Sequence, residues 1–370
     1  MKKIKVMSIF GTRPEAIKMM PIVKEMDNYL NELDSVVVIT GQHRQMLDQI
    51  LNQFDIKPDY DLDIMKIGQT LTDITTKILI ELEPIMKLER PDIVLVHGDT
   101  TTALAGSLAA YYQQIKVGHV EAGLRTGDKY SPFPEEMNRH LIDGISDLHF
   151  APTVMSENNL IKENVSKETI HVTGNTAIDA LLYTLKEEYS HPILDRIDDT
   201  QKLILLTMHR RENLGQPMYD VFLAVKKLVR DFPDIHIVFP MHKNNQVRKY
   251  ATELLGHLDR VHLIEPLEVV DFQNLLAKSY LVLTDSGGIQ EEAPSLGIPV
   301  LVLRDTTERP EGVLAGTLKL AGTQERSVYS ALRELLVDQK QYDYMTKAKN
   351  PYGTGDASKQ IIEAILNDFM

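Results

Sequence analysis

The stretch KVMSIFGTRPEAIK, residues 5–18, predicts a buried strand that runs directly into a helix. The segment from Lys5 to Phe10 is a nearly continuous apolar run, as expected of a strand that helices cover on both faces of a sheet. Thr12 and Glu15 fit a capping box, and Pro14 suits the first turn of the helix that follows. Such a turn begins a βαβ unit, and βαβ units build parallel sheets.

The same alternation of strand and helix continues through both halves of the chain. Further apolar runs expected to be strands are Val36 to Thr40, Ile93 to His97, Val117 to Glu121, Leu148 to Ala151, Leu203 to Thr207, Ile235 to Pro240, Val261 to Ile264, Leu281 to Thr284 and Val300 to Leu303. One sheet of so many strands would be unusually wide. We therefore expect an α/β protein with two Rossmann-like, doubly wound parallel-sheet domains, and one large sheet is the alternative.

The first domain boundary is expected after residue 173, where the strand-like segment Thr169 to Thr173 gives way to Gly-Asn-Thr and then to charged sequence. The N-terminal domain would span residues 1–173 and the C-terminal domain residues 174–350. A Pro/Gly break then precedes a final amphipathic stretch. We expect residues 351–370 to form a helix that crosses back to the N-terminal domain, the alternative being a terminal helix on the second domain.

Composition excludes several classes of function. Among 370 residues, 40 Lys and Arg stand against 53 Asp and Glu, so a net charge of -13 disfavours nucleic acid and anionic membrane as partners. The absence of cysteine excludes disulfides, thiolate metal sites and cysteine nucleophiles. No run approaches the ~20 apolar residues of a membrane helix, and the N-terminus does not read as a signal peptide. We expect a soluble, cytoplasmic protein.

Ligands of open α/β sheets bind beyond the carboxyl ends of the strands, so the residues there carry the chemistry. Arg13 and Lys18 flank a predicted helix N-terminus, which favours an anion. In the second half, Ser286-Gly287-Gly288 would let backbone N–H groups approach a pyrophosphate. Glu291 and Glu292 either compensate the helix dipole or accept ribose hydroxyls. The segments match neither GxGxxG nor GxxxxGK[ST], so neither a nicotinamide cofactor bound in the usual way nor a P-loop is expected.

Acidic residues follow two neighbouring strands of the first half. Asp99 and Glu121 stand at strand ends, and Glu135 follows along the chain. Asp99 could instead cap the next helix, and Glu121 could instead pair with Arg125. Carboxylates that share a partly buried cleft have pKa values pushed apart, which suits acid and base catalysis.

Histidines also follow strands. His209, followed by two arginines, suits a phosphate. His97, His119, His209 and His242 lack local metal-ligand spacing, so no metal site is expected.

Several motifs taken together resemble one family. They are Gly11-Thr12-Arg13-Pro14-Glu15, His97-Gly98-Asp99-Thr100, His119-Val120-Glu121-Ala122-Gly123-Leu124-Arg125, Pro134-Glu135-Glu136, His209-Arg210-Arg211-Glu212, Asp285 through Glu292, and Arg304 through Pro310. Their order and spread over nearly the whole chain resemble the non-hydrolysing bacterial UDP-N-acetylglucosamine 2-epimerases. The resemblance implies a GT-B fold with the UDP-sugar in an interdomain cleft, and a homodimer. It also implies interconversion of UDP-N-acetylglucosamine and UDP-N-acetylmannosamine for bacterial surface polysaccharides.

The resemblance also implies roles for matching residues. Those expected to be catalytic are Asp99, Glu121, Glu135 and His209. Those expected to bind the UDP-sugar are Arg13, Lys18, Arg139, Ser286, Gly287, Gly288, Glu292 and Arg309. The N-terminal domain would then be the sugar and regulatory side, the C-terminal domain would bind UDP, and no cofactor or metal would be needed.

The chemistry agrees with this set, because the C2 hydrogen of the sugar is not adjacent to a carbonyl. The practical route expels UDP from C1 while C2–H is abstracted, which gives 2-acetamidoglucal; UDP then re-adds and C2 is protonated from the opposite face. Which carboxylate is acid and which is base is left open. The alternatives are a GT-B glycosyltransferase that uses a UDP-sugar donor, a hydrolysing epimerase and a non-catalytic UDP-sugar sensor.

A regulatory site is implied as well. In bacterial members a second UDP-N-acetylglucosamine binds and activates, and the matching residues are Gln42, His43, Gln45, Gln69, Arg210 and His242. The alternative is that residues 42–45 cap the helix after the second strand.

Overall fold

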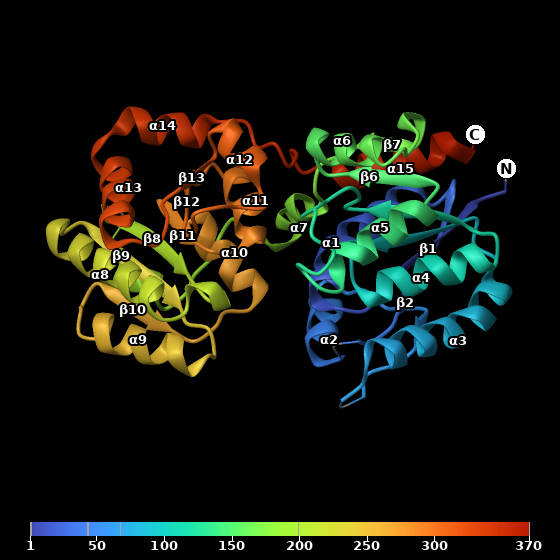
Figure 1. The fold of residues 1–370 in the computed structure, drawn as a ribbon, viewed down its shortest axis with the longest axis horizontal. Helices are drawn as coiled ribbons and strands as arrows, with labels where there is room; N and C mark the ends of the chain where they lie inside the picture. The colour runs from blue at the N-terminus through green and yellow to red at the C-terminus, as the bar shows by residue number, and fades with distance from the viewer. Residues whose placement is uncertain (1, 43, 67, 199, 370) are drawn as a thin grey trace. The chain divides into compact units, whose positions relative to one another are not determined.

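A computed structural model describes residues 2–42, 44–66, 68–198 and 200–369, and of residues 44–46 only the backbone. The chain divides into two compact units (Figure 1). The first unit comprises Met1–Tyr183 and Tyr352–Met370, and the second comprises Thr184–Pro351.

The first unit contains a seven-stranded sheet in the order β3-β2-β1-β4-β5-β6-β7. Its strands, all parallel, are β1 (Ile4–Phe10), β2 (Leu33–Ile39), β3 (Tyr60–Asp61), β4 (Ile93–His97), β5 (Lys116–Val120), β6 (Leu148–Ala151) and β7 (Ile170–Val172). Its helices are α1 (Arg13–Met26), α2 (Arg44–Gln53), α3 (Leu71–Glu89), α4 (Thr101–Tyr112), α5 (Glu135–Ile145), α6 (Val154–Lys162), α7 (Thr176–Thr184) and α15 (Ala357–Phe369), with 3₁₀ turns η1 (Asp27–Tyr29) and η2 (Lys167–Thr169). The strand order reverses between β1 and β4, which creates the switch point where ligands of such sheets bind.

The second unit contains a six-stranded sheet in the order β10-β9-β8-β11-β12-β13. Its strands, also parallel, are β8 (Lys202–Thr207), β9 (Ile235–Pro240), β10 (Val261–Ile264), β11 (Leu281–Thr284), β12 (Val300–Val302) and β13 (Leu318–Leu320). Its helices are α8 (Gln216–Asp231), α9 (Asn245–Leu255), α10 (Val269–Ala277), α11 (Gly287–Ser295), α12 (Pro310–Ala315), α13 (Glu325–Val337) and α14 (Gln339–Lys347), with 3₁₀ turns η3 (Leu194–Arg196) and η4 (Arg211–Asn213). Here the order reverses between β8 and β11.

Alternating residues of β8 show why its sequence is apolar throughout. Ile204 and Leu206 belong to one buried cluster, whereas Leu203 and Leu205 belong to another. Since successive strand residues point to opposite faces, each face of this sheet has its own core. The predicted fold class of two doubly wound parallel sheets is confirmed.

Most predicted strands are present. Five have the predicted bounds, namely β4, β6, β9, β10 and β11. Two short strands were not predicted: β3, of two residues, and β13, of three residues. Both lie at the edge of their sheet, where no long apolar run is needed.

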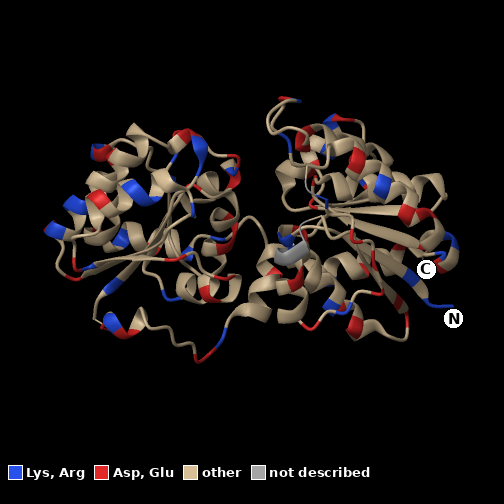
Figure 2. Cartoon of the chain, turned by 90° about the horizontal axis from the view of Figure 1, so that it is seen from below, with Lys and Arg blue, Asp and Glu red and all other residues tan. Residues whose placement is uncertain are grey.

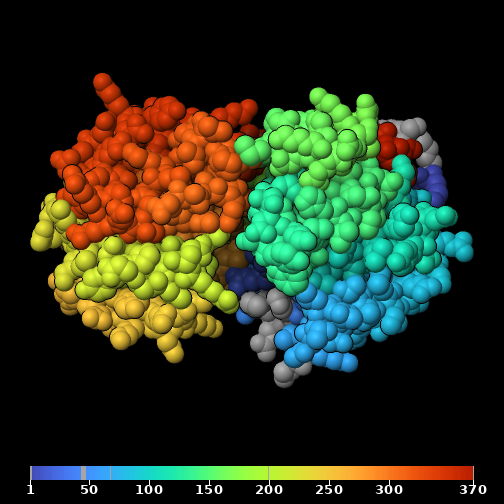
Figure 3. Space-filling view, in the orientation of Figure 1, coloured from blue at the N-terminus to red at the C-terminus, as the bar shows by residue number. Residues whose placement is uncertain are grey.

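The unit boundaries differ from those predicted. The sequence placed them after residues 173 and 350, whereas the structure places them after Tyr183 and Pro351. Helix α7 stays with the first unit because the Asp179 carboxylate accepts hydrogen bonds from the backbone N–H groups of Ala357 and Ser358, at 3.3 and 2.7 Å. Figure 3 shows red atoms of the C-terminal segment beside the green and blue atoms of this unit, and helix α15 contacts α1.

Charged residues are spread over both units. Figure 2 shows Lys and Arg interspersed with Asp and Glu along the helices. A helix long and apolar enough to cross a bilayer is not found among the described residues.

Candidate functional site

The turn from β1 into α1 is built as the sequence predicts. Thr12 and Glu15 form the capping box, and Glu15 Oε2 accepts hydrogen bonds from the N–H groups of Gly11 and Thr12 at 3.1 and 2.8 Å. Glu15 Oε1 accepts a hydrogen bond from Thr100 Oγ1 at 2.6 Å, which ties this turn to the loop after β4. Burial raises the pKa of Glu15, although these hydrogen bonds oppose the rise. A Cβ on Gly11 would stand 1.9 Å from Thr40 Oγ1, so only glycine fits there.

Glu121 follows β5, and polar side chains from other elements surround its carboxylate. Lys18 Nζ, from α1, donates a hydrogen bond to Glu121 Oε1, and Asn175 Nδ2 donates to the same oxygen at 3.0 Å. His97 Nε2 lies 3.9 Å from Glu121 Oε2, but burial lowers the pKa of His97 to about 3, so this ring is neutral. Lys18 is therefore a charge partner of Glu121. The alternative pairing with Arg125 is wrong, because the Arg125 guanidinium instead contacts the carboxylates of Asp143 and Glu163.

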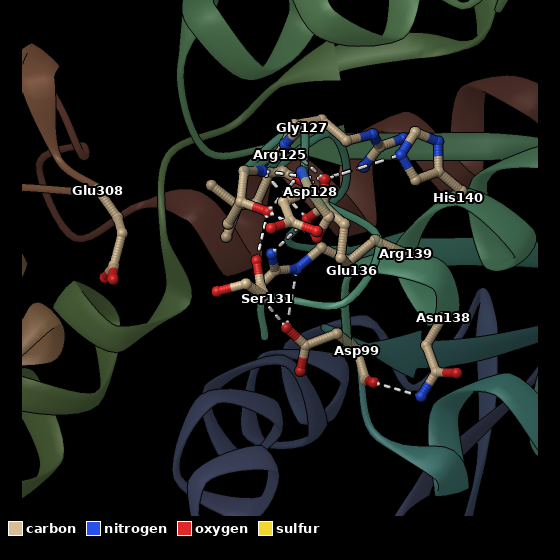
Figure 4. A network of polar contacts seen from close by, with 12 residues as sticks. Asp99, Arg125, Gly127, Asp128, Ser131, Glu136, Asn138, Arg139, His140 and Glu308 are labelled. Atoms are coloured by element: carbon tan, nitrogen blue, oxygen red, sulfur yellow. Dashed lines mark hydrogen bonds and ion pairs between the residues drawn. The ribbon is translucent and has the colours of Figure 1, made fainter. Parts of the chain in front are cut away.

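The alternative role of Asp99, as the cap of the helix after β4, is wrong, because Thr100 is the N-cap of that helix. The Asp99 carboxylate is instead held by Arg139, whose Nε and Nη2 lie 2.8 and 2.6 Å from Oδ2. Asn138 Nδ2 donates a hydrogen bond to the Asp99 carbonyl at 2.8 Å. Figure 4 shows these contacts reaching from α5 to the Asp99 turn. Arg139, predicted to bind substrate, is thus engaged with a predicted catalytic carboxylate.

Two adjacent glutamates at the start of α5 differ in their surroundings. Glu136 is buried and accepts hydrogen bonds from the N–H groups of Thr126 and Gly127 at 3.0 and 2.9 Å, and from Arg139 Nη1 at 3.0 Å. Burial acts to raise the pKa of Glu136, but these donors lower it below the usual value. Oε2 of Glu135 is buried and has no hydrogen-bond partner among the described residues. Such an oxygen is suited to receive a ligand group.

The Glu121 carboxylate lies close to the turn that carries Asp99. A Cβ on Gly98 would stand 3.4 Å from Glu121 Oε2, so the Glu121 carboxylate lies against the residue that precedes Asp99. Gly98 has a left-handed φ of 65°, and so does Glu121, at 66°. Residues other than glycine rarely adopt this backbone conformation, and those that do cluster at functional sites.

In the second unit, a buried aspartate fixes the loop that carries His209. Asp285 Oδ2 accepts hydrogen bonds from the N–H groups of His209 and Arg210 and from Asn213 Nδ2, at 3.0, 2.9 and 2.9 Å. Nδ1 of His209 lies 3.5 Å from Asp285 Oδ1. The His209 and His242 rings stack with centroids 5.5 Å apart. Burial and the neighbouring His209 lower the pKa of His242.

The start of α11 presents backbone N–H groups beside two guanidinium groups. Ser286 is the N-cap, followed by Gly287 and Gly288. A Cβ on Gly287 would stand 3.7 Å from Arg309 Nη2 and 3.9 Å from Arg210 Nη2. A helix N-terminus beside two guanidinium groups is suited to bind an anion.

Carboxylates hold these guanidinium groups in place. Arg309 Nε donates a hydrogen bond to Glu291, and Arg210 donates two to Glu308, both at 3.1 Å. Burial acts to raise the pKa of Glu308, but Arg210 and Arg304 lower it to about 2. Glu292 accepts a hydrogen bond from Gln273 at 3.0 Å.

The predicted regulatory residues are divided between the units. Gln42 Oε1 accepts a hydrogen bond from Thr102 at 2.9 Å, and Gln69 lines a cavity of about 460 Å³ in the first unit. Arg210 and His242 belong to the second unit. His43 and the side chain of Gln45 lie outside the described residues.

Three asparagines of the site were not predicted: Asn138, Asn175 and Asn213. Each donates a side-chain hydrogen bond within the carboxylate networks above. Asn138 carried a signal, because a buried polar residue on the sheet-facing side of an amphipathic helix needs a partner. Within the described ranges, His, Asp and Glu side chains form no group of three that could hold a metal ion.

Comparison with known proteins gives the family. A sequence profile described as UDP-N-acetylglucosamine 2-epimerase matches residues 25–366. The Bacillus subtilis UDP-N-acetylglucosamine 2-epimerase is 62% identical over 366 residues, which cover 99% of this chain and 96% of that protein.

Solved structures agree. A Listeria monocytogenes relative has a TM-score of 0.96 at 55% identity and covers 100% of this chain and 97% of that chain. The Neisseria meningitidis UDP-GlcNAc 2-epimerase bound to UDP-GlcNAc has a TM-score of 0.87 at 50% identity, and it covers 98% of this chain and 100% of that chain. The glycosyltransferase of kitacinnamycin shares only the fold with this chain, which supports the GT-B type. It is 10% identical, has a TM-score of 0.67, and covers 100% of this chain and 99% of that chain. This chain therefore belongs to the UDP-N-acetylglucosamine 2-epimerase family.

Proposed function

We propose that this protein interconverts UDP-N-acetylglucosamine and UDP-N-acetylmannosamine at C2 without net hydrolysis. One observation carries the proposal. In the first unit, the Glu121 carboxylate lies against Gly98, the residue before Asp99, and the Asp99 and Glu121 carboxylates contact the cations Arg139 and Lys18, respectively. Family membership supplies the substrate class, and this arrangement supplies groups for proton transfer.

UDP is proposed to bind the second unit. The N-terminus of α11, at Ser286, Gly287 and Gly288, would accept the diphosphate, with Arg309 beside it. Glu292 is proposed to accept the ribose hydroxyls. His209 would stabilise phosphate as the C1–O bond breaks, because its backbone is fixed by Asp285 and 45% of its side chain is exposed.

The sugar is proposed to react beside the carboxylates of the first unit. One carboxylate removes the proton from C2 while the C1–O bond breaks. The electron pair of the C1–O bond leaves with UDP. The C2–H electrons form the C1–C2 double bond of 2-acetamidoglucal. Re-addition of UDP at C1, with protonation of C2 from the opposite face by a second acid, completes the epimerisation. Asp99, Glu121 and Glu135 are the proposed proton carriers, and Arg13 and Lys18 are proposed to bind the UDP-sugar.

Ion pairs within the first unit support these roles. Lys18 and Arg139 each hold a carboxylate within the first unit. These contacts fix the orientation of the two carboxylates, which a group that removes a proton requires. The buried Oε2 of Glu135 has no hydrogen-bond partner among the described residues, which leaves it available to a group of the ligand.

Further parts of the proposal extend beyond the reaction. We propose a cytoplasmic homodimer that uses no cofactor and binds a second UDP-N-acetylglucosamine as activator. The proposed activator site comprises Gln42, His43, Gln45, Gln69, Arg210 and His242. Light scattering gives the oligomeric state. Equilibrium binding with one UDP-sugar per subunit, together with hyperbolic kinetics for UDP-N-acetylmannosamine at all concentrations, would contradict the activator site.

Proton NMR in D2O tests the reaction. Purified protein is incubated with UDP-N-acetylglucosamine, without nicotinamide, metal or acceptor. UDP-N-acetylmannosamine with deuterium at C2 is the expected product. Free N-acetylmannosamine with UDP would indicate a hydrolysing enzyme, and turnover only with an added acceptor would indicate a transferase. Unchanged sugar nucleotide that still protects the protein against heat would indicate a sensor.

A further inference from the structure

Asn175 joins the Glu121 carboxylate to the start of helix α7. Asn175 is buried, and both ends of its side-chain amide are engaged. Nδ2 donates a hydrogen bond to Glu121 Oε1 at 3.0 Å, and Oδ1 accepts one from the N–H group of Ala177 at 2.9 Å. Because α7 begins at Thr176, the contact with Ala177 is that of a helix N-cap. A backbone N–H only donates, so this cap fixes the amide oxygen and leaves the NH₂ group to face the carboxylate.

The backbone of Asn175 is held by the segment that returns to the first unit at Tyr352. The N–H group of Asn175 donates a hydrogen bond to the Tyr352 carbonyl at 2.7 Å. A Cβ on Gly174 would stand 3.0 Å from that carbonyl oxygen and 3.1 Å from the Cα of Gly353, so the two segments are in direct contact. Further along, Asp179 ties α7 to the start of α15. The main chain at Asn175 is therefore fixed from both sides.

Two donors of different kinds meet at one oxygen of Glu121. Lys18 Nζ and Asn175 Nδ2 both donate to Oε1. Lys18 reaches this oxygen through a long, flexible stem, whereas the Asn175 side chain is short and fixed at its other end. Oε2 is the oxygen that lies toward Gly98, where an added Cβ would stand 3.4 Å from it. Asn175 thus restricts the rotation of the carboxylate more tightly than Lys18 does.

We infer that Asn175 is a positioning residue for epimerisation, which holds Glu121 by Oε1 and so directs Oε2 toward the Gly98–Asp99 turn. The effect on catalysis rests on the proposed function of Glu121, whereas the contact between the two side chains does not. The amide carries no charge, so Asn175 contributes orientation and Lys18 contributes the charge. The mechanism proposed above contains no role for Asn175.

Denaturant unfolding at neutral pH tests the contact without any need for activity. Asn175→Asp keeps an oxygen for the N-cap, but it turns a second carboxylate oxygen toward Glu121 in place of the NH₂ group. We expect the midpoint to fall. Glu121→Gln, whose amide can donate to the new carboxylate, should raise the midpoint again in the Asn175→Asp background but not in the wild-type background.

The matched control for the cap is another asparagine. Asn244 caps α9 in the same way, its Oδ1 accepting from the N–H group of Gln246 at 2.8 Å, and α9 carries none of the proposed site residues. Asn244→Asp should therefore keep the wild-type midpoint. A midpoint of Asn175→Asp equal to that of the wild type would overturn the inference.

Kinetics test the positioning role. Asn175→Ser keeps a hydroxyl that can cap α7, but its side chain is too short to reach Glu121. We expect kcat and deuterium incorporation at C2 to fall by about 10- to 100-fold while the Kd for UDP stays within about threefold, because proton transfer depends steeply on geometry. Asn244→Ser should keep the wild-type kcat. If Asn175→Ser does not fold, Asn175→Asp takes its place in this assay with the same expectation.

A double variant separates positioning from a general loss of structure. If Asn175 acts through Glu121, adding Asn175→Ser to Glu121→Gln should change C2 exchange by no more than about threefold. Losses that multiply in full, or an unchanged kcat in folded Asn175→Ser, would contradict the role. Wild-type protein without epimerase activity would refute the proposed function instead, while the unfolding of the variants would still report the contact.

Discussion

Replacing Gly287 with alanine should separate ligand binding from stability. Gly287 is the first residue of α11, and an added Cβ would meet no atom closer than 3.7 Å. Such contacts are ordinary, and Gly287 has no positive φ that alanine would strain. We therefore expect the free energy of unfolding to stay the same or to rise by about 0.4–1 kcal/mol, because alanine restricts the unfolded chain.

The same methyl group should weaken UDP binding. It would point toward Arg309 Nη2 at 3.7 Å and Arg210 Nη2 at 3.9 Å, where a phosphate would bridge these groups and the helix N-terminus. Loss of one hydrogen bond to a charged phosphate corresponds to about 1.5–3 kcal/mol. The Kd for UDP should therefore rise by about 10- to 150-fold.

Isothermal titration with UDP and denaturant unfolding measure the two effects. Gly144→Ala, on α5, is the matched control, because its Cβ would meet nothing within 4 Å and no phosphate is proposed there. The control should gain similar stability and keep its UDP affinity. A Kd within about threefold of wild type in folded Gly287→Ala would refute the placement of the diphosphate. A loss of more than about 1 kcal/mol of stability would refute the fit of the methyl group.

Three further substitutions test other parts of the site. Gly11→Ala would place a Cβ 1.9 Å from Thr40 Oγ1, so denaturant unfolding should reveal a loss of about 1–3 kcal/mol, and an unchanged midpoint would contradict this. Burial raises the pKa of Glu15 above its unfolded value, so the ionised side chain destabilises the fold as pH rises through that raised pKa. The stability of Glu15→Gln relative to wild type should therefore increase with pH above about 4.3, and a difference independent of pH would oppose this reasoning. Glu121→Gln should lower deuterium incorporation at C2 by at least about 100-fold while UDP affinity stays within about threefold, and retained exchange would remove Glu121 from proton transfer.

The central strands were predictable because both of their faces are buried. In β4 and β11 every residue is buried, so each strand is a run of apolar residues that closes on one buried polar residue, His97 or Thr284, at the strand end. That residue also marks the functional edge, which is why Asp99 and Asp285 could be placed before the structure. The edge strand β3 has two residues and no such run, so periodicity could not reveal it.

The partners of the carboxylates were less predictable. Local spacing suggested Arg125 for Glu121, four positions away, whereas the partners are Lys18, 103 positions earlier, and Asn175, 54 positions later. Asp99 is likewise held by Arg139, 40 positions later. Contacts of this kind depend on which loops the sheet order brings together, and a pattern confined to one element does not contain that order.

The ion pairs of the second unit bear on how UDP would bind. Two cations beside the proposed diphosphate site already hold carboxylates: Arg309 holds Glu291, and Arg210 holds Glu308. These partners keep the guanidinium groups oriented, so little side-chain entropy is lost when a phosphate arrives. They also neutralise charge that would otherwise attract it, so each contact adds less affinity than a lone arginine would. Such pairs suit a reaction in which UDP leaves the sugar and then re-adds to it within the site. The guanidinium groups keep their geometry throughout, while the affinity for UDP stays moderate.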